Sequence, residues 1–497
     1  MGRAYGLAMP DTVPRAASES TMLLSGKLWK DSDRQWDREQ IIWNRELSVP
    51  RPIAIELFSG AGGLSLGFEQ AGFDVMAAVE IDPIHCAVHE FNFPRCTVFP
   101  QSVAHLTGAE IRSRAGIGRR RVDVVFGGPP CQGFSLIGHR AMDDPRNGLV
   151  REFVRIVDEL KPSYFVFENV KGLTVGSHRS FLEELIATFS DCGYKVQLPW
   201  QVLDAACFGV PQHRDRLILM GARRGMRLPN YPAPSCQPAD RTKVAGLTKG
   251  PTCRDAIDDL PNAEQFDELN FSDEVRAHKW GRLSKYAEQM RCAGEQSWNF
   301  GYEREWDRKL VTSSLRTEHT AISRRRFEST EPGQVEPISR FYKLSPEGLC
   351  NTLRAGTDSA RGAFTSPRPI HYAFPRCVTV REMARLHGFP DWFRFHVTKW
   401  HGARQIGNAV PPPLGRAVAS KIIEALGGVA ERPVDRIALG NPRLLRMDMS
   451  DASAYFGISV PIARRDRKSG QKKRKQHEIE GELELALPFE SALALTI

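Results

Sequence analysis

The stretch IAIELFSGAGGLSLGFEQAG, residues 53–72, decides the fold because it joins an apolar run, a glycine-rich turn and an amphipathic run. This order predicts a strand, a tight turn and a helix. Further apolar runs have the length of strands, and stretches with helical periodicity such as LVREFVRIVDEL lie between them. These runs are DVMAAVE (74–80), VDVVFGG (122–128), YFVFENV (164–170) and RLILMGA (216–222). The alternation predicts an α/β fold with a largely parallel sheet covered by helices on both faces.

The alternation of strands and helices ends near Pro234, and this change marks a second region. Residues 235–375 are rich in Arg, Gly, Pro and Ser, which favours a smaller, irregular domain. Farther along, RQIGNAVPPP precedes an amphipathic helix with a glycine stop, and we expect it to return to the first domain. The predicted parts are an N-terminal extension (1–50), the first part of a discontinuous α/β domain (51–235), the irregular domain (236–399), a return segment (400–428) completing the α/β domain and a loosely packed, basic C-terminal tail (429–497).

The composition is that of a globular protein with a basic surface. The chain has 497 residues, of which 41% are hydrophobic and 26% charged, and its net charge is +9. A basic balance is compatible with a polyanionic partner, although the run RRDRKSGQKKRK (464–475) is more typical of a solvated tail than of a DNA-binding arm. No apolar run reaches the roughly 18 residues of a membrane helix, and the first residues lack the apolar core of a secretory signal. The ten cysteines include no CxxC pair, which favours a reducing compartment and argues against structural zinc.

The glycine turn predicts a binding site for a nucleotide-like ligand. Gly60 and Gly62 stand where the first strand meets the first helix, and glycines there let a ligand approach the backbone. The spacing departs from the dinucleotide fingerprint because Ser65 stands where its last glycine is expected. Glu80 closes the second strand about twenty residues later, where a carboxylate can accept ribose hydroxyls, and Ile81 offers an apolar face for an adenine. Since no P-loop lysine follows, the ligand needs no phosphates, and S-adenosylmethionine fits that description.

The segment GGPPCQGFS, residues 127–135, puts a thiol on a stiff corner after a strand. Pro129 and Pro130 each fix φ and remove a backbone donor. A stiff loop can aim Cys131 as a nucleophile at the sheet edge that carries the glycine turn, with the thiolate as the reactive species. For this segment taken alone, a cysteine in a rigid turn without chemistry is the alternative.

Two later strands supply polar side chains to the same edge. YFVFENV ends in Glu168 and Asn169, and neighbouring strands of such a sheet would bring this carboxyl near the thiol. FGVPQHRDRLILMG places Gln212, Arg214 and Arg216 at alternate positions, which points three polar side chains to one side. An arginine pair there could bind phosphates and the acid. Surface salt bridges, the alternative, explain one arginine better than the whole set.

In order along the chain, these motifs resemble those of the DNA (cytosine-5)-methyltransferases of the bacterial modification-methylase type. The resemblance runs from Ile53 to about Leu426 and covers FSGAGG, the acid of VEIDP, GGPPCQGFS, FENV, QHRDR, REMARLHGFP and RQIGNAVPP. It implies a Rossmann-like, S-adenosylmethionine-dependent domain, a target-recognition domain over residues 236–399, and methylation of cytosine C5 within a specific sequence of double-stranded DNA. One departure is Ser102 in QSVAHL, where the family often has an acid that touches the adenine amine.

The resemblance also implies roles for individual residues. Cys131 adds to cytosine C6, Glu168 holds a proton at N3, Arg214 supports the flipped base and Arg216 braces the loop. The cofactor pocket is assigned to Phe58, Gly60, Gly62, Glu80, Ile81, Pro129, Asn408 and Val410. Contacts to the DNA are assigned to Gln132, Ser135, Asn169 and Gln212, and base or phosphate readers in the irregular domain to Arg324, Arg325, Arg326 and Arg354.

Three alternatives stay open on the sequence alone. An RNA cytosine methyltransferase belongs to a branch of the same family, but that branch has a smaller interdomain segment. An amino-group methyltransferase would carry an acid or Asn, two prolines and an aromatic residue where this chain has Gly128 to Cys131. Intact Cys131, Glu168 and Arg214 argue against a non-catalytic DNA-binding protein with a decayed site.

The expected setting is the bacterial cytoplasm, with the enzyme acting as a monomer on the DNA of the nucleoid. It would belong to a restriction-modification system with a cognate restriction endonuclease, or act as a solitary modification enzyme. We expect no metal and no membrane association.

Overall fold

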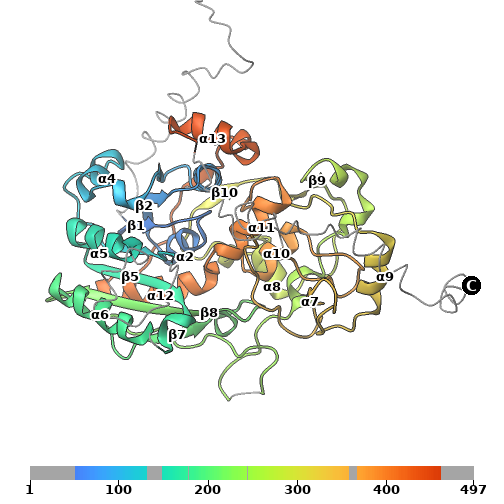
Figure 1. Cartoon of the computed structure of the whole chain (residues 1–497), viewed down its shortest axis with the longest axis horizontal. Helices are drawn as coiled ribbons and strands as arrows, with labels where there is room; N and C mark the ends of the chain where they lie inside the picture. Colours follow the sequence, from blue (N-terminus) through green and yellow to red (C-terminus); the bar gives the residue numbers. More distant parts are fainter. Residues whose placement is uncertain (1–50, 131–147, 177, 243–244, 358–366, 461–497) are drawn as a thin grey trace, which may run out of the picture. The chain divides into compact units, whose positions relative to one another are not determined.

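The computed structural model describes residues 51–460 except 131–147, 177, 243–244 and 358–366 (Figure 1). Its centre is an 8-stranded sheet in the order β3-β2-β1-β4-β5-β8-β6, with β7 paired to β8. β1 to β5 run parallel, whereas β8 runs antiparallel to β5, β6 and β7. The strands are β1 (Ile53–Leu57), β2 (Asp74–Glu80), β3 (Thr97–Pro100), β4 (Val124–Gly127), β5 (Tyr164–Val170), β6 (Tyr194–Val196), β7 (Gln201–Asp204) and β8 (Asp215–Arg223). The predicted, largely parallel sheet is confirmed.

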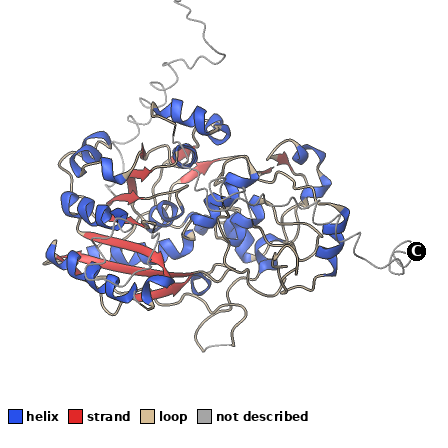
Figure 2. Cartoon of the chain, viewed as in Figure 1, coloured by secondary structure: helices blue, strands red, loops and turns tan. Residues whose placement is uncertain are grey.

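Helices cover both faces of this sheet, as predicted (Figure 2). Every residue of β1 is buried, and successive side chains point to opposite faces. Ile55 and Leu57 therefore pack in a core with α4, α5 and α6, while Ala54 packs in a core with α2 and α12. The helices are α2 (Gly63–Ala71), α3 (Pro83–Asn92), α4 (Gly108–Arg114), α5 (Gly148–Leu160), α6 (His178–Asp191) and α12 (Pro412–Leu426).

Two glycines of α2 let the return segment pack directly on the first helix. A Cβ atom at Gly63 would lie 2.5 Å from the Val410 carbonyl oxygen, and one at Gly67 would lie 2.7 Å from the Arg416 amide nitrogen. The two glycines are one helical turn apart, so they open one continuous face to the partner backbone. The predicted contact between the return segment and the first part of the α/β domain is therefore present. The division into five parts stays a prediction.

Residues 236–399, called the irregular segment below, contain short elements joined by long loops. These elements are α7 (Cys253–Ile257), β9 (Val275–Arg276), α8 (Lys285–Met290), β10 (Glu303–Glu305), β11 (Leu310–Val311), α9 (Ala321–Ser329) and α10 (Val380–Leu386), and α11 (Lys399–Asn408) follows. Buried ion pairs hold these pieces together. Arg385 contacts Asp259 at 3.0 Å and Asp391 at 2.6 Å, and Arg376 contacts Glu382 at 2.8 Å.

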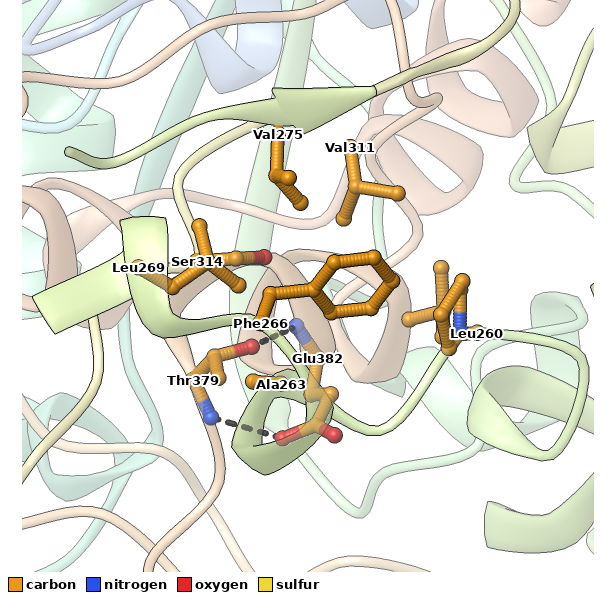
Figure 3. Close-up of a pocket in the computed structure, with 10 residues that line it drawn as sticks. Leu260, Ala263, Phe266, Leu269, Val275, Val311, Ser314, Thr379 and Glu382 are labelled. Carbon is orange, nitrogen blue, oxygen red and sulfur yellow. Dashed lines mark hydrogen bonds between the residues drawn. The ribbon is translucent and has the colours of Figure 1, made fainter. Parts of the chain in front are cut away.

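A small cavity of about 10 Å³ lies within the irregular segment (Figure 3). That volume is about the size of one water molecule. Thr379 and Glu382 close one side by capping the start of α10 with reciprocal hydrogen bonds. The lining residues are Leu260, Pro261, Ala263, Phe266, Leu269, Val275, Val311, Ser314, Thr379 and Glu382. None of them is a predicted site residue, and the cavity is a gap in packing.

The expectation of a loosely packed tail from residue 429 is wrong for residues 436–457. β12 (Arg436–Ala438) pairs in parallel with β10, and α13 (Met449–Phe456) packs against α3. The stretch between β12 and α13 carries apolar residues between its charges. Three of these are buried, namely Leu444, Leu445 and Met447. The basic run 464–475 lies outside the described residues. No helix in the described part of the chain is long and apolar enough to cross a membrane.

Candidate active site

The glycine turn holds a carboxylate over its backbone. Gly60 and Gly62 have φ values of 53° and 99°, which glycine adopts without strain. Glu80, at the end of β2, accepts the Gly60 N–H at 2.8 Å on one oxygen and the Asp82 N–H at 2.9 Å on the other. The carboxylate is partly exposed, and each oxygen keeps a lone pair for a ligand hydroxyl.

The surroundings of Glu80 fit an adenosine-like ligand such as S-adenosylmethionine. Ile81 is 62% exposed, so a large apolar side chain is available beside the carboxylate. A Cβ atom at Gly60 would meet nothing within 4 Å, so the turn opens onto free space. Phe58, also with a positive φ, is partly exposed at the end of β1. Ser102 accepts the Ala104 N–H at 3.3 Å and caps its own turn.

The return segment reaches this turn through α11. Asn408 is exposed at the end of α11, and buried Val410 lies with its carbonyl oxygen against Gly63. His387 contacts the Ala409 carbonyl oxygen through Nε2 at 3.0 Å and the Gln212 amide through Nδ1 at 2.9 Å. One acceptor partner and one donor partner suit a neutral imidazole. Burial, followed by the charge of Arg214, lowers the pKa of His387 well below its ordinary value.

Glu168 lies at the carboxyl edge of the sheet beside the end of β4. β4 and β5 are neighbours, with Gly127 paired to Phe167, so the expected adjacency of these two strands is confirmed. Glu168 Oε1 contacts Arg216 Nε at 2.7 Å. A Cβ atom at Gly128 would lie 2.2 Å from Glu168 Oε2, so only glycine leaves room for this carboxyl. Burial raises the pKa of Glu168 despite the opposing charges of Arg216 and Arg214.

The start of the cysteine corner is tied to β5. Pro129 is buried, and its carbonyl oxygen accepts a hydrogen bond from Asn169 Nδ2 at 3.1 Å. Cys131, Gln132 and Ser135 lie outside the described residues. The structure therefore describes the backbone leading to the corner and the acid beside it.

Gln212 and Arg214 are fully buried and act as braces between segments. Arg214 donates to the Leu353 carbonyl at 3.0 Å and to the Gly407 carbonyl at 2.8 Å. Gln212 accepts the Leu353 N–H at 3.0 Å. Gly407 in turn packs tightly on Arg354, since a Cβ atom at Gly407 would lie 2.4 Å from the Arg354 carbonyl carbon. Sequence reasoning did not find these partners, which lie more than a hundred residues away.

The four arginines proposed as readers of DNA differ in their surroundings. Arg324 and Arg326 form ion pairs with Glu264 and Glu336, whereas Arg325 and Arg354 are exposed.

A buried polar cluster lies behind the glycine turn and was not predicted from the sequence. Glu56 accepts hydrogen bonds from the backbone and hydroxyl of Ser65, whose oxygen also contacts His89 at 3.1 Å. The only sequence signal was Ser65 in the place of a fingerprint glycine.

The sheet order, the glycine turn with its acid, and the buried acid beside β4 define the class: a Rossmann-like methyltransferase domain. A family model described as C-5 cytosine-specific DNA methylase matches residues 53–424, and the chain belongs to this family. The protein is thus a DNA (cytosine-5)-methyltransferase, and its family uses S-adenosylmethionine. The family match argues against the amino-group alternative.

Three relatives align with this chain over most of its length. The Type II methyltransferase M.XorII of Xanthomonas oryzae pv. oryzae is 57% identical over 431 residues, which are 86% of this chain and 98% of that protein. The Type II methyltransferase M1.HphI of Haemophilus parahaemolyticus is 36% identical, with 74% of this chain and 86% of that protein covered. A solved DNA modification methyltransferase encoded within an E. coli prophage is 32% identical with a TM-score of 0.58, covering 76% of this chain and 99% of that one.

Proposed function

We propose that the protein methylates C5 of cytosine within a specific sequence of double-stranded DNA, through a covalent bond between Cys131 and C6 of a flipped cytosine. The observation that carries this proposal is the buried Glu168, oriented by Arg216 and packed against Gly128, three residues before the cysteine. Cytosine C5 alone is a weak nucleophile, so the site must activate the ring. Base-modifying enzymes take the base out of the duplex at a cost of a few kcal/mol to do such chemistry.

The chain's own residues supply the activation. As the Cys131 thiolate adds to C6, N3 accepts the proton that Glu168 holds, and C5 becomes the nucleophilic carbon of an enamine. The raised pKa of Glu168 keeps its proton available closer to neutral pH. S-adenosylmethionine, when bound, supplies an electrophilic methyl group. A base then removes the C5 proton, the C5–C6 double bond re-forms as the Cys131 thiolate leaves, and N3 returns its proton to Glu168.

The cofactor would be held where the glycine turn, β2 and the return segment meet. Glu80 is placed to accept ribose hydroxyls, and Ile81 with Phe58 offers apolar surface to the adenine. Asn408 and Val410 would close the pocket from the end of α11, and Pro129 from the start of the cysteine corner. Gly60 and Gly62 let the ligand approach the turn.

We assign the reading of flanking bases to the irregular segment. The catalytic residues touch groups common to every cytosine, and phosphate contacts position without specifying. Exposed Arg325 and Arg354 support this assignment, as does the position of Arg354 beside Gly407 and the Arg214 brace. Likeness to Type II methyltransferases supports a role in a bacterial restriction-modification system. We propose in addition that a monomer acts on chromosomal DNA in the cytoplasm.

Trapping on 5-fluorocytosine tests the proposed chemistry. Duplex DNA containing this base should form a complex with the wild type that survives denaturation, because the C5 fluorine cannot leave as a proton does. Cys131→Ala should form no such complex and should abolish methyl transfer, while still binding DNA. Turnover of Cys131→Ala within about tenfold of the wild type would contradict a covalent step, since a tenfold change is only about 1.4 kcal/mol of barrier.

A further inference from the structure

His213 lies between the two braces of the site but points away from them. Gln212 and Arg214 on either side are fully buried, whereas the side chain of His213 is 38% exposed. This is the alternation expected of an extended segment leading into β8. His213 has no part in the proposed chemistry.

Both ring nitrogens of His213 face carboxylates. Nδ1 lies 2.7 Å from Asp204 Oδ2, and Nε2 lies 2.8 Å from Asp240 Oδ2. A neutral imidazole has one N–H and one acceptor nitrogen, so it would set a lone pair against one of these oxygens. Only the imidazolium can donate to both. His387 nearby has one donor partner and one acceptor partner and shows the opposite, neutral arrangement.

These contacts join three parts of the chain. Asp204, at the end of β7, also accepts the Arg214 N–H at 3.1 Å, and Asp240 belongs to the first residues of the irregular segment. The backbone of His213 donates to the Cys350 carbonyl at 3.2 Å and accepts from the Thr352 hydroxyl at 2.7 Å. The imidazole ring thus ties the extended segment that carries Arg214 and leads into β8 to the beginning of the irregular segment, and the backbone of His213 ties it to residues 350–352.

We propose that His213, held as an imidazolium between Asp204 and Asp240, is a positioning residue that fixes the irregular segment to Arg214 and to β8, which carries Arg216. The charged groups that face it are Asp204, Asp240 and Arg241, whose guanidinium lies 3.6 Å from Asp204. This inference rests on the proposed function, because it matters to catalysis only if Arg216 orients Glu168. Loss of the proton removes one of the two anchors and loosens the join.

The pKa of His213 supports the geometry. Burial acts to lower it, but hydrogen bonds to Asp240 and Asp204 and their charges outweigh burial and raise it. A raised pKa means that the stabilising contact is complete below the ordinary value of about 6.5 and is lost as pH rises through the folded value. Methylation should therefore decline with rising pH for a reason that lies outside the catalytic groups.

The test compares wild type with Asp240→Asn, His213→Ala and, as a control, His278→Ala, an exposed histidine. Single-turnover methylation of unmethylated genomic DNA is measured at saturating S-adenosylmethionine from about pH 6 to about pH 9. Asp240→Asn should lower the pKa of His213, so its rate relative to wild type should fall as pH rises, by up to about tenfold per unit of pKa separation. Repeated over a range of S-adenosylmethionine concentrations, the assay should show a lower maximal rate for His213→Ala with an unchanged half-saturating concentration, and His278→Ala should match the wild type.

Hydrogen exchange provides a readout that does not need activity. After correction for intrinsic pH dependence, residues 236–242 of the full chain should lose protection at higher pH in the wild type and at lower pH in Asp240→Asn. A rate ratio independent of pH, or protection that is the same in both proteins, would overturn the inference. A wild type that exchanges as expected but does not methylate would instead contradict the proposed function.

Discussion

Glu168 at the sheet edge and Glu382 in the irregular segment are both buried, and each is paired with an arginine. Glu382 receives two hydrogen bonds from Arg376, both at 2.8 Å, and one from the Thr379 N–H at 2.7 Å. Burial would raise its pKa, but these partners lower it to about 2. Glu168 receives a contact from Arg216 on one oxygen, and its pKa is raised. Burial beside an arginine therefore does not identify a catalytic acid.

What separates the two carboxyls is whether both oxygens receive donors. Glu382 receives a guanidinium N–H on each oxygen and a backbone N–H on one of them, so it stays ionised and serves the fold. The second oxygen of Glu168 instead packs against the backbone of Gly128, at the start of the cysteine corner. The irregular segment uses buried ion pairs because it has few regular elements, whereas the sheet rests on apolar cores and keeps its reactive charges at one edge.

Glu168→Gln should lower activity and leave stability nearly unchanged, which tests the catalytic half of this comparison. The amide preserves shape but cannot give up a proton to N3, so kcat should fall by about 10²- to 10⁴-fold, the usual contribution of a general acid. The melting temperature should change little, because the folded state already disfavours the ionised carboxyl. Single-turnover methylation and thermal unfolding measure the two effects. A variant with near-normal kcat would remove Glu168 from the chemistry.

Glu382→Gln should act in the opposite way, on stability. It leaves Arg376 buried without its charge partner, which costs about 3–5 kcal/mol of unfolding free energy. Glu183→Gln, which removes one partner of the exposed Arg179–Glu183 pair, should cost no more than about 1 kcal/mol. Because the pKa of Glu382 is lowered, its contribution is present above about pH 4.5 and is lost on acidification toward about 2. The variant should therefore show a weaker loss of stability than wild type in that range.

The sequence predicted the sheet region well because its signals are local. Buried parallel strands are continuous apolar runs, and the glycine turn is formed by residues adjacent in the sequence. The position of Glu80 over Gly60 could therefore be expected. The neighbouring strands β4 and β5 also followed from the α/β pattern. These features depend on little beyond periodicity and turn chemistry.

Features that depend on distant contacts were not predictable. From the sequence, Arg214 is expected by resemblance to support the flipped base, and nothing near it in the sequence points to its partners in the structure, the carbonyls of Leu353 and Gly407. The apolar residues near Leu444 read as part of a charged tail, because their partner surface on α3 lies far away in the chain. In the irregular segment, no local pattern separates an arginine that holds the fold from one that faces solvent.

Glu80→Ala sharpens the comparison at the other end of the sheet edge. It removes the acceptor for ribose hydroxyls, so S-adenosylmethionine affinity should fall by about 1.5–3 kcal/mol, the range for hydrogen bonds to a charged group. Calorimetry measures this loss, and DNA affinity serves as the control because it should not change. Unchanged cofactor affinity would place the ribose elsewhere.

The smallest effect should come from the surface of the irregular segment, where Arg324 and Arg325 are neighbours with different surroundings. Arg324 is already paired with Glu264, so Arg324→Ala should cost at most about 1 kcal/mol of stability and leave DNA binding nearly unchanged. Exposed Arg325 is available for a phosphate. If Arg325 contacts a DNA phosphate, Arg325→Ala should reduce the slope of log affinity against log salt by about 0.9. Titrations of duplex DNA at several salt concentrations measure both variants. Equal slopes for the two variants would show that exposure does not mark the DNA-binding arginines of this helix, and would move the search to Arg354.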